Sequence, residues 1–461
     1  MFRMKNIFYG CLLALSGLTV LFSGCTKEDL DLTPLSAIGD NGFYQNADEV
    51  RGAVIAMYDG LQQIPLREFA LTEMRSDNTR TKSSEGDWKQ FQDLDVKPTN
   101  LAVGTYWSAN YNVVFRANRV LENLDNVEDA DLRIKFEGEA RFVRALAYFN
   151  LVRAFGEVPL VDRVIIQTDE EFFDRDSEEA VYSLIISDFE QARSLLPTRS
   201  NTPFGRATAG AAGGMLGKVL LTRGDYAKAE TVLSEVISSG EYTLQDDYAD
   251  VFYNEGNSEI LFAIPYLDDD ANEGQDFSFE FTAGGAVSGL NYLTDDLINA
   301  LDPEDEERNA VLRNPDNPAE VGKFLTQSAD ARLAGNDWIV LRYADVLLML
   351  SEAILEGGNS TSNLTAINAY NQVRARAGLE TLPTDGSGTL TKEALLYERR
   401  IELAFENQRL YDLIRFGVAD SVLGAFAAAE GFSYEPTDLL LPIPQAEINV
   451  SNNLLTQNPG Y

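Results

Sequence analysis

The sequence predicts a mostly α-helical protein in which paired helices form a scaffold and an irregular, loop-rich region with short strands lies over it. Three observations predict this fold class. Apolar residues recur at three- and four-residue spacing in both halves of the chain, which is typical of amphipathic helices. Glycine or proline ends several of these stretches. Between residues 258 and 334 the helical period is absent, and strand-like runs alternate with Gly- and Phe-rich segments.

The amphipathic period defines the expected helices in order. They are 48–64, 107–126, 132–155, 178–196, 206–223, 226–239, 340–356, 364–377 and 392–416. Pro65, Gly156 and Pro197 follow three of these ranges and are expected to end the helices there. The apolar run 259–264 predicts a strand at the beginning of the loop-rich region.

The helices expected at 206–223 and 226–239 are joined by Gly224-Asp225. Two amphipathic helices with a tight glycine turn, and with alanine at positions of close approach, resemble a tetratricopeptide (TPR) unit. The ranges 340–356 and 364–377 are a second candidate pair. The scaffold is therefore expected to be a TPR-like helical repeat.

The first 25 residues have the pattern of an export signal. An apolar run, 7–22, follows two basic residues and is short for a membrane span, which needs ~20 apolar residues. The sequence Ser23-Gly24-Cys25 resembles the lipobox of bacterial lipoproteins, in which the cysteine becomes the acylated first residue. We predict a signal peptide over 1–24 and lipidation at Cys25. An ordinary secretory signal and a retained anchor helix are the alternatives.

The residues after Cys25 indicate a destination. Lys27, Glu28 and Asp29 resemble the signal that directs Bacteroidetes lipoproteins to the outer face of the outer membrane. The alternative is a solvated, flexible linker. We therefore expect a protein of the cell outer membrane that is lipid-anchored at the extracellular face.

Composition excludes several function classes. The formal net charge is −36, and so acidic a protein repels nucleic acid. The chain has no histidine, which excludes Ser-His-Asp and Cys-His nucleophile systems and histidine-rich metal sites. Cys11 leaves with the signal peptide and Cys25 is acylated, so we expect no disulfide in the mature chain.

An ordered set of segments gives the most specific pattern. It comprises 107–111, 116–119, 138–149, 156–160, 337–353 (DWIVLRYADVLLMLSEA), 371–378, 398–417 (ERRIELAFENQRLYDLIRFG), 441–448 and 457–461. In this order the segments resemble the SusD/RagB family of outer-membrane nutrient-binding lipoproteins. The resemblance covers nearly all of residues 25–461, which we predict to be a single SusD-like domain with a ligand-binding insertion at about 258–334.

The family resemblance implies a function. SusD-like proteins bind nutrient oligosaccharides and deliver them to a SusC-like TonB-dependent outer-membrane transporter, whereas the RagB branch binds peptides. Recognition in this family involves no chemistry, so we expect neither enzyme activity nor a cofactor. A surface hydrolase with paired carboxylates is the remaining alternative, and no motif supports it. The helical side is expected to face the transporter, and the loop side the ligand.

The loop 75–91 is the first candidate for ligand contact. Trp88 is the one tryptophan outside a recognisable scaffold helix and stands among polar residues, which suits stacking on a sugar ring. Asp77, Asn78 and Arg80 are the expected partners of hydroxyl or amide groups. The alternative for Trp88 is a satellite hydrophobic cluster beneath the loop.

The segment 275–292 is the second candidate. Phe277, Phe279 and Phe281 alternate, which would place three rings on one face of a strand. Phe277 and Tyr292, with Asn291, are the expected contacts, and a buried strand face is the alternative.

Two further clusters receive other interpretations. Asp268, Asp269 and Asp270 offer hard oxygen ligands to Ca²⁺, but their spacing does not match a known calcium loop, so a solvated acidic loop is expected instead. The many arginines and carboxylates of 398–415, together with Arg374 and Arg376, are expected to clamp helices, with acid–base catalysis as the alternative. Trp107 and Trp338 are expected in the core.

Overall fold

The computed structural model describes residues 43–81, 86–165, 169–282, 291–318 and 320–461. The predicted signal peptide at 1–24, the predicted lipidation site Cys25 and the acidic leader after it lie outside these residues. Within the described ranges, no helix is both long enough and apolar enough to span a bilayer.

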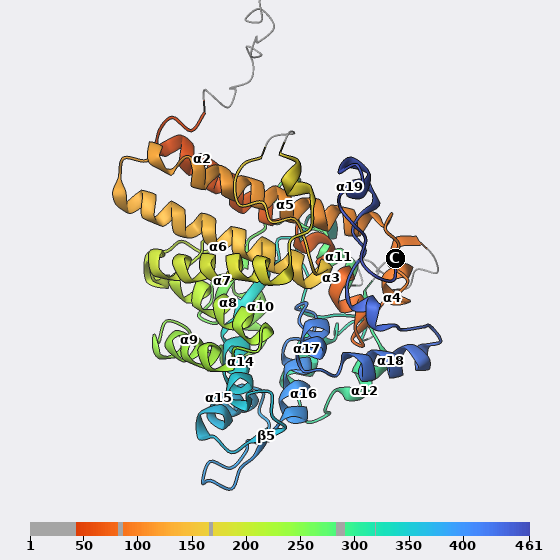
Figure 1. Ribbon diagram of the computed structural model, residues 1–461. Coiled ribbons are helices and arrows are strands. Elements are labelled where there is room, and N and C mark those ends of the chain that lie inside the picture. Colours follow the sequence, from red (N-terminus) through yellow and green to blue (C-terminus); the bar gives the residue numbers. More distant parts are fainter. Residues whose placement is uncertain (1–42, 82–85, 166–168, 283–290, 319) are drawn as a thin grey trace, which may run out of the picture.

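A stack of helices runs down one side of the molecule, from orange through green to cyan in Figure 1. It consists of α2 (Ala47–Leu61), α5 (Leu101–Glu122), α6 (Ala130–Phe155), α7 (Glu178–Leu195), α8 (Ala209–Thr222), α9 (Tyr226–Ser238), α14 (Tyr343–Leu355) and α15 (Leu364–Arg376). Each helix contacts its neighbours in this order, which is the arrangement of a helical repeat. The mostly α, TPR-like fold class predicted from the sequence is confirmed.

Glycine allows the central helices of the stack to approach closely. Helix α8 is buried from Ala211 to Leu221. A Cβ atom at Gly217 would overlap Leu233 on α9, and one at Gly214 would overlap Leu341. Larger residues at these two positions would therefore separate α8 from the elements on both of its sides.

Shorter elements form the rest of the molecule. The helices are α3 (Pro65–Thr72), α4 (Gly86–Gln92), α10 (Asp250–Tyr253), α11 (Phe277–Phe281), α12 (Asp295–Ala300), α13 (Glu306–Leu312), α16 (Lys392–Glu402), α17 (Arg409–Arg415), α18 (Ala419–Glu430) and α19 (Gln445–Val450). The strands pair antiparallel as β1 (Thr79–Arg80) with β3 (Tyr292–Leu293), β2 (Ile260–Ile264) with β4 (Trp338–Arg342), and β5 (Ser360–Thr361) with β6 (Leu390–Thr391). Strands β2 and β4 flank the predicted insertion and contact α8, so they join both of its ends to the stack.

Several predicted element boundaries are wrong, including the start of α5, which is Leu101 rather than residue 107. Pro65 follows α2 closely but begins α3, because the first helical position needs no N–H donor. The range 340–356 begins as β4, whose backbone pairs with β2, and helix α14 starts only at Tyr343. The range 392–416 is divided into α16 and α17 by Phe405 and Asn407, whose φ angles of +67° and +59° are left-handed.

Candidate functional site

The two loops predicted to bind a ligand meet in the β1–β3 ladder. Thr79 pairs with Leu293, and Arg80 pairs with Tyr292. The guanidinium carbon of Arg80 lies 5.2 Å from the centre of the Tyr292 ring, within the range of a cation–π interaction. Two of the predicted contact residues, distant in the sequence, are therefore direct neighbours.

Helix α18 borders the other side of Arg80. Arg80 Nη1 lies 3.5 Å from Glu430 Oε2, and the two side chains are 30% and 28% exposed. A long, partly exposed ion pair of this kind contributes little to stability. Both charged groups are therefore accessible to a ligand at small cost to the fold.

Trp88 lies on α4 and is half-buried. Its ring stacks on Phe69, with centroids 5.5 Å apart and planes 16° apart, and it also contacts Phe91. Phe69 in turn contacts Phe281. The core therefore holds the indole in place from the inside, and the rest of its surface is exposed.

Asp77 and Asn78 are buried and bind the scaffold. Arg409 donates two hydrogen bonds of 2.7 Å to the Asp77 carboxylate. Arg400 Nε donates to Asn78 Oδ1 at 2.9 Å. Burial opposes ionisation of Asp77, but Arg409 and Arg400 outweigh it and hold the pKa of Asp77 below its usual value. As packed, neither side chain has a surface to present to a ligand.

Phe277 is also buried, and its predicted strand is wrong. Residues Phe277–Phe281 form the single helical turn α11. The Phe277 ring contacts Trp338 at 5.3 Å and Phe324 at 5.4 Å. Alternation along a strand cannot be distinguished from a short aromatic helix in so few residues. The alternative interpretation of these rings, a buried position, matches the structure.

Several polar atoms next to Arg80 have no hydrogen-bond partner in the described part of the chain. They are Arg80 Nε, Thr79 Oγ1 and both polar atoms of the Asn291 amide, all of them buried. Buried polar groups are normally paired, so this group of donors and acceptors is unusual. Arg80 and Asn291 were expected contacts, whereas Thr79 was not predicted.

A second layer of hydrogen bonds positions β1. Thr294 Oγ1 donates to the Asp77 carbonyl at 2.7 Å, and Asn78 Nδ2 donates to Glu73 Oε2 at 3.3 Å. The Asn407 N–H donates to the other Glu73 oxygen at 2.9 Å. Burial raises the pKa of Glu73 to about 7, although these hydrogen bonds act in the opposite direction. The start of β1 is thus held by the turn after α3, by Thr294 before α12 and by the loop before α17.

Two family models match the chain in its two halves. Residues 35–221 match a model described as "Starch-binding associating with outer membrane", and residues 320–461 match the "SusD family" model. The chain is therefore similar to SusD-family proteins in both halves. Relatives of the family extend over the whole sequence: SusD-like protein P2 of Formosa agariphila is 27% identical, with 95% of this chain and 97% of the relative covered. Starch-binding protein SusD of Bacteroides thetaiotaomicron is 23% identical, with 99% of each chain covered.

Solved structures of SusD-like proteins share the fold. A laminarin-binding SusD-like protein has a TM-score of 0.76 and 26% identity, with 91% of this chain and 100% of that chain covered. Surface glycan-binding protein A from Bacteroides thetaiotaomicron, in complex with laminarihexaose, has a TM-score of 0.75 and 23% identity, with coverages of 89% and 99%. At 23% identity, the similarity to surface glycan-binding protein A shows a shared fold and nothing more.

The carboxylates of the acidic run 268–270 accept hydrogen bonds from backbone N–H groups and so stabilise the surrounding loops. Asp269 Oδ1 accepts a hydrogen bond of 2.9 Å from the Ala329 N–H, and Asp270 Oδ1 accepts one of 2.8 Å from the Asn272 N–H. Asp268 Oδ1 accepts one of 2.6 Å from the Gly335 N–H. Among the described residues, no group of three or more His, Cys, Asp or Glu side chains is arranged to hold a metal ion.

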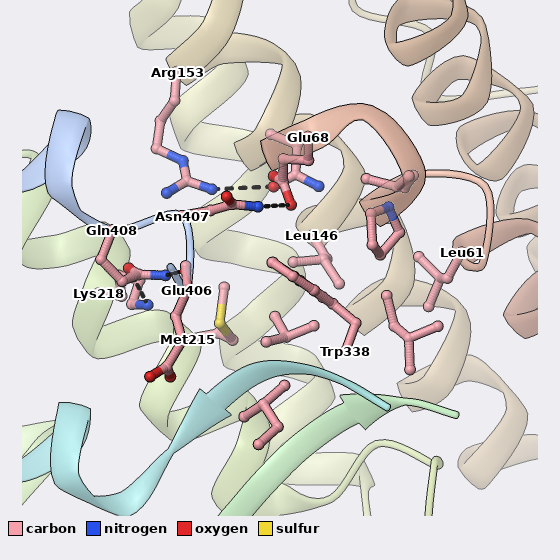
Figure 2. Close-up of a pocket in the computed structure, with 16 residues that line it drawn as sticks. Leu61, Glu68, Leu146, Arg153, Met215, Lys218, Trp338, Glu406, Asn407 and Gln408 are labelled. Atoms are coloured by element: carbon pink, nitrogen blue, oxygen red, sulfur yellow. Dashed lines mark hydrogen bonds between the residues drawn. The ribbon is translucent and has the colours of Figure 1, made fainter. Parts of the chain in front are cut away.

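An interior cavity of about 40 Å³ lies between the stack and the loop before α17 (Figure 2). Glu68, Arg153 and Lys218 line it together with Trp338. Asn407 Nδ2 donates to Glu68 at 3.0 Å, and Lys218 Nζ donates to Gln408 at 3.0 Å (Figure 2). A polar void of this size suits water rather than a nutrient.

Open grooves lie away from the β1–β3 ladder. One of about 930 Å³ is lined by residues of α5 and α19, and one of about 430 Å³ by residues of α2 and of the loop around Gly205. Neither is lined by a residue that the sequence predicted to bind the ligand.

Some of the expected helix clamps belong to a buried charge network. It consists of Glu259, Asp305, Arg308, Lys323, Arg342, Arg376, Glu398, Glu402 and Glu406. Arg374 joins it through Glu398. The clamping role predicted for Arg374 and Arg376 is confirmed, whereas no role was predicted for Arg308 and Arg342. Trp107 and Trp338 are buried as predicted.

Proposed function

We propose that this protein is an outer-membrane lipoprotein that binds oligosaccharides and passes them, chemically unchanged, to a SusC-like TonB-dependent transporter. After removal of residues 1–24, Cys25 anchors the single domain 25–461 at the extracellular face. The similarity to the SusD family models and to a laminarin-binding SusD-like protein of 26% identity supports a glycan as the ligand.

The observation that carries the proposal is the composition of the β1–β3 face, which we define as the partly exposed side chains of Arg80, Tyr292, Trp88 and Glu430. Helix α4, which carries Trp88, is joined to the end of β1 because Gln92 accepts a hydrogen bond from the Thr81 N–H. A half-buried indole, Trp88, and a phenol ring, Tyr292, offer apolar surfaces of the kind that stack on sugars. Between β3 and α18, Arg80 and Glu430 offer a donor and an acceptor for hydroxyl groups. A few polar groups set among rings are typical of a recognition site.

The carboxylates near this face do not favour hydrolysis. Asp77 is buried and bound by two arginines, and Glu430 is paired with Arg80. Glycoside hydrolysis needs one protonated and one ionised carboxyl group on opposite sides of the bond. Asp77, with its lowered pKa and no exposed surface, suits neither role.

Calorimetric titration with panels of linear oligosaccharides and of peptides tests the proposal. We expect an oligosaccharide to bind without product release. Trp88→Ala and Tyr292→Ala should each weaken binding by about tenfold or more, because each removes a stacking surface. Tyr226→Ala, on α9 of the helical stack, is the matched control and should leave affinity unchanged. If only peptides bind, the protein is instead a peptide-binding protein of the RagB type.

The anchor is tested separately. Cys25→Ala should leave ligand affinity intact in purified protein. It should abolish growth on the bound glycan, because the binding protein is no longer held at the membrane beside its transporter. Normal growth combined with normal surface display of the variant would refute the anchoring role.

A further inference from the structure

Helix α18 is attached to the molecule differently from the helices of the stack. Leu410, Leu413, Ala419 and Leu423 form a small hydrophobic cluster that is separate from the main core. Towards β1, α18 is joined by the Arg80–Glu430 pair. Figure 1 shows α18 at the edge of the molecule, away from the helical stack. Helix α18 therefore borders the β1–β3 ladder and is packed on its own small hydrophobic cluster rather than on the main core.

An aromatic pair lies on α18 and the turn that follows it. Phe426 precedes Glu430 by four residues, so the two side chains share one face of α18. The helix ends at Gly431, whose φ is +85°, and the Phe432 N–H then donates to the Ala427 carbonyl. This turn brings the Phe432 ring to 5.9 Å from the Phe426 ring, edge to face at 77°.

The two rings are not used by either hydrophobic cluster. Both are half-buried, and neither is among the residues of the main core, of the small cluster beneath α18 or of the side chains packed against them. Aromatic rings that contribute little to a core, and that share a helix face with an accessible carboxylate, are typical of a binding surface.

We propose that Phe426 and Phe432 form an outer subsite for the distal sugar units of an oligosaccharide whose inner units lie on Trp88 and Tyr292. This inference rests on the proposed function. The Arg80–Glu430 pair lies between the two aromatic surfaces and offers hydrogen bonds to hydroxyl groups of the connecting unit. Short ligands occupy the inner surface alone, and longer ligands reach both surfaces.

If the outer subsite exists, the affinity for an oligosaccharide should depend on its length, because only longer ligands reach Phe426 and Phe432. Hexasaccharides of linear glucans, mannans, xylans and galactans are first screened for binding to the unaltered protein. The affinities of the hexasaccharide that binds and of the trisaccharide of the same sugar are then compared. In Phe426→Ala and Phe432→Ala we expect hexasaccharide affinity to fall by about threefold to tenfold and trisaccharide affinity to stay the same. Phe115→Ala, at an exposed ring on α5, is the matched control.

Conservative variants protect the test against unfolding. Phe426→Leu and Phe432→Leu keep an apolar side chain in the turn but remove the flat ring, and they should show the same selective loss for the longer ligand. Equal losses for both lengths, or no loss for the hexasaccharide, would overturn the outer subsite while leaving Trp88 and the proposed function in place. Failure of every hexasaccharide to bind the unaltered protein would overturn both.

Discussion

The buried charge network and the β1–β3 face use the same kinds of residue in opposite ways. Glu402 is fully buried and is bound by Arg308, Arg342 and Arg376. Arg80, in contrast, is partly exposed. Among the described residues it has one long ion pair, and its Nε atom has no hydrogen-bond partner. Removing a buried partner leaves charges uncompensated, whereas removing a partner from an exposed pair changes little. Burial and the number of partners, rather than residue type, therefore separate scaffold from site.

The largest effect is expected at Glu402. Glu402→Ala should lower the free energy of unfolding by about 3–5 kcal/mol, because three buried guanidinium groups lose a shared carboxylate. Chemical denaturation measures this loss. Asp48→Ala, which breaks the exposed pair with Arg51, is the control and should cost about 1 kcal/mol or less. A loss at Glu402 as small as that of the control would contradict the distinction between the two regions.

A second, smaller effect depends on pH. Burial raises the pKa of Glu73 from 4.5 to about 7, so the folded state binds the proton more tightly than the unfolded state does. Its contribution to stability is fully present below about pH 4.5 and is lost as the pH rises through about 7, at most about 3 kcal/mol.

Glu73→Gln should therefore reduce the fall in stability between pH 5 and pH 8, as measured by thermal or chemical unfolding at several pH values. The contribution of Glu402 to stability changes with pH in the opposite direction. Burial alone would raise its pKa, but Arg376, Arg342 and Arg308 lower it, so its contribution is lost only as the pH falls below the unfolded-state value. An unchanged pH dependence in Glu73→Gln would show that this carboxyl group does not titrate as inferred.

The sequence predicted the scaffold better than the site, for a physical reason. The stack follows from the apolar period along each helix, which is a local property. Asp77 and Asn78 were predicted to face a ligand, but their burial depends on Arg400 and Arg409, which lie far along the chain. The same tertiary contacts explain why 392–416 is not one helix: the loop between α16 and α17 directs Asn407 to Glu68 and Glu73.

The neighbourhood of Arg80 was only half predictable. The sequence suggested Arg80 and Tyr292 separately, and their pairing across β1 and β3 needed the fold. Glu430 and Thr79 had no local signal. Asn291 was an expected contact, but the lack of a hydrogen-bond partner for its amide among the described residues cannot be predicted from a residue type.

A third prediction contrasts two arginines. Arg80→Ala should weaken oligosaccharide binding by about tenfold while changing the free energy of unfolding by about 1 kcal/mol or less, since its ion pair is long and partly exposed. Arg409→Ala should do the reverse and destabilise the protein, because Asp77 is buried and loses a two-hydrogen-bond partner. Titration and denaturation of both variants measure the two effects. A stability loss in Arg80→Ala as large as that in Arg409→Ala would place Arg80 in the scaffold.

The smallest effect on stability is expected at Asn291. Its amide is buried, and neither polar atom has a hydrogen-bond partner among the described residues. An unpaired buried amide is a cost to the folded state, so Asn291→Ala should leave the free energy of unfolding unchanged within about 1 kcal/mol or raise it, even though the residue is fully packed. The same change should weaken oligosaccharide binding severalfold if the amide is kept for a ligand. Asn407→Ala is the contrasting variant. The buried Asn407 amide donates to Glu68 and accepts from Thr72, so its loss should destabilise the protein without a selective effect on binding. A marked loss of stability in Asn291→Ala would mean that the amide serves the fold, and the argument from unpaired atoms to the site would then fail.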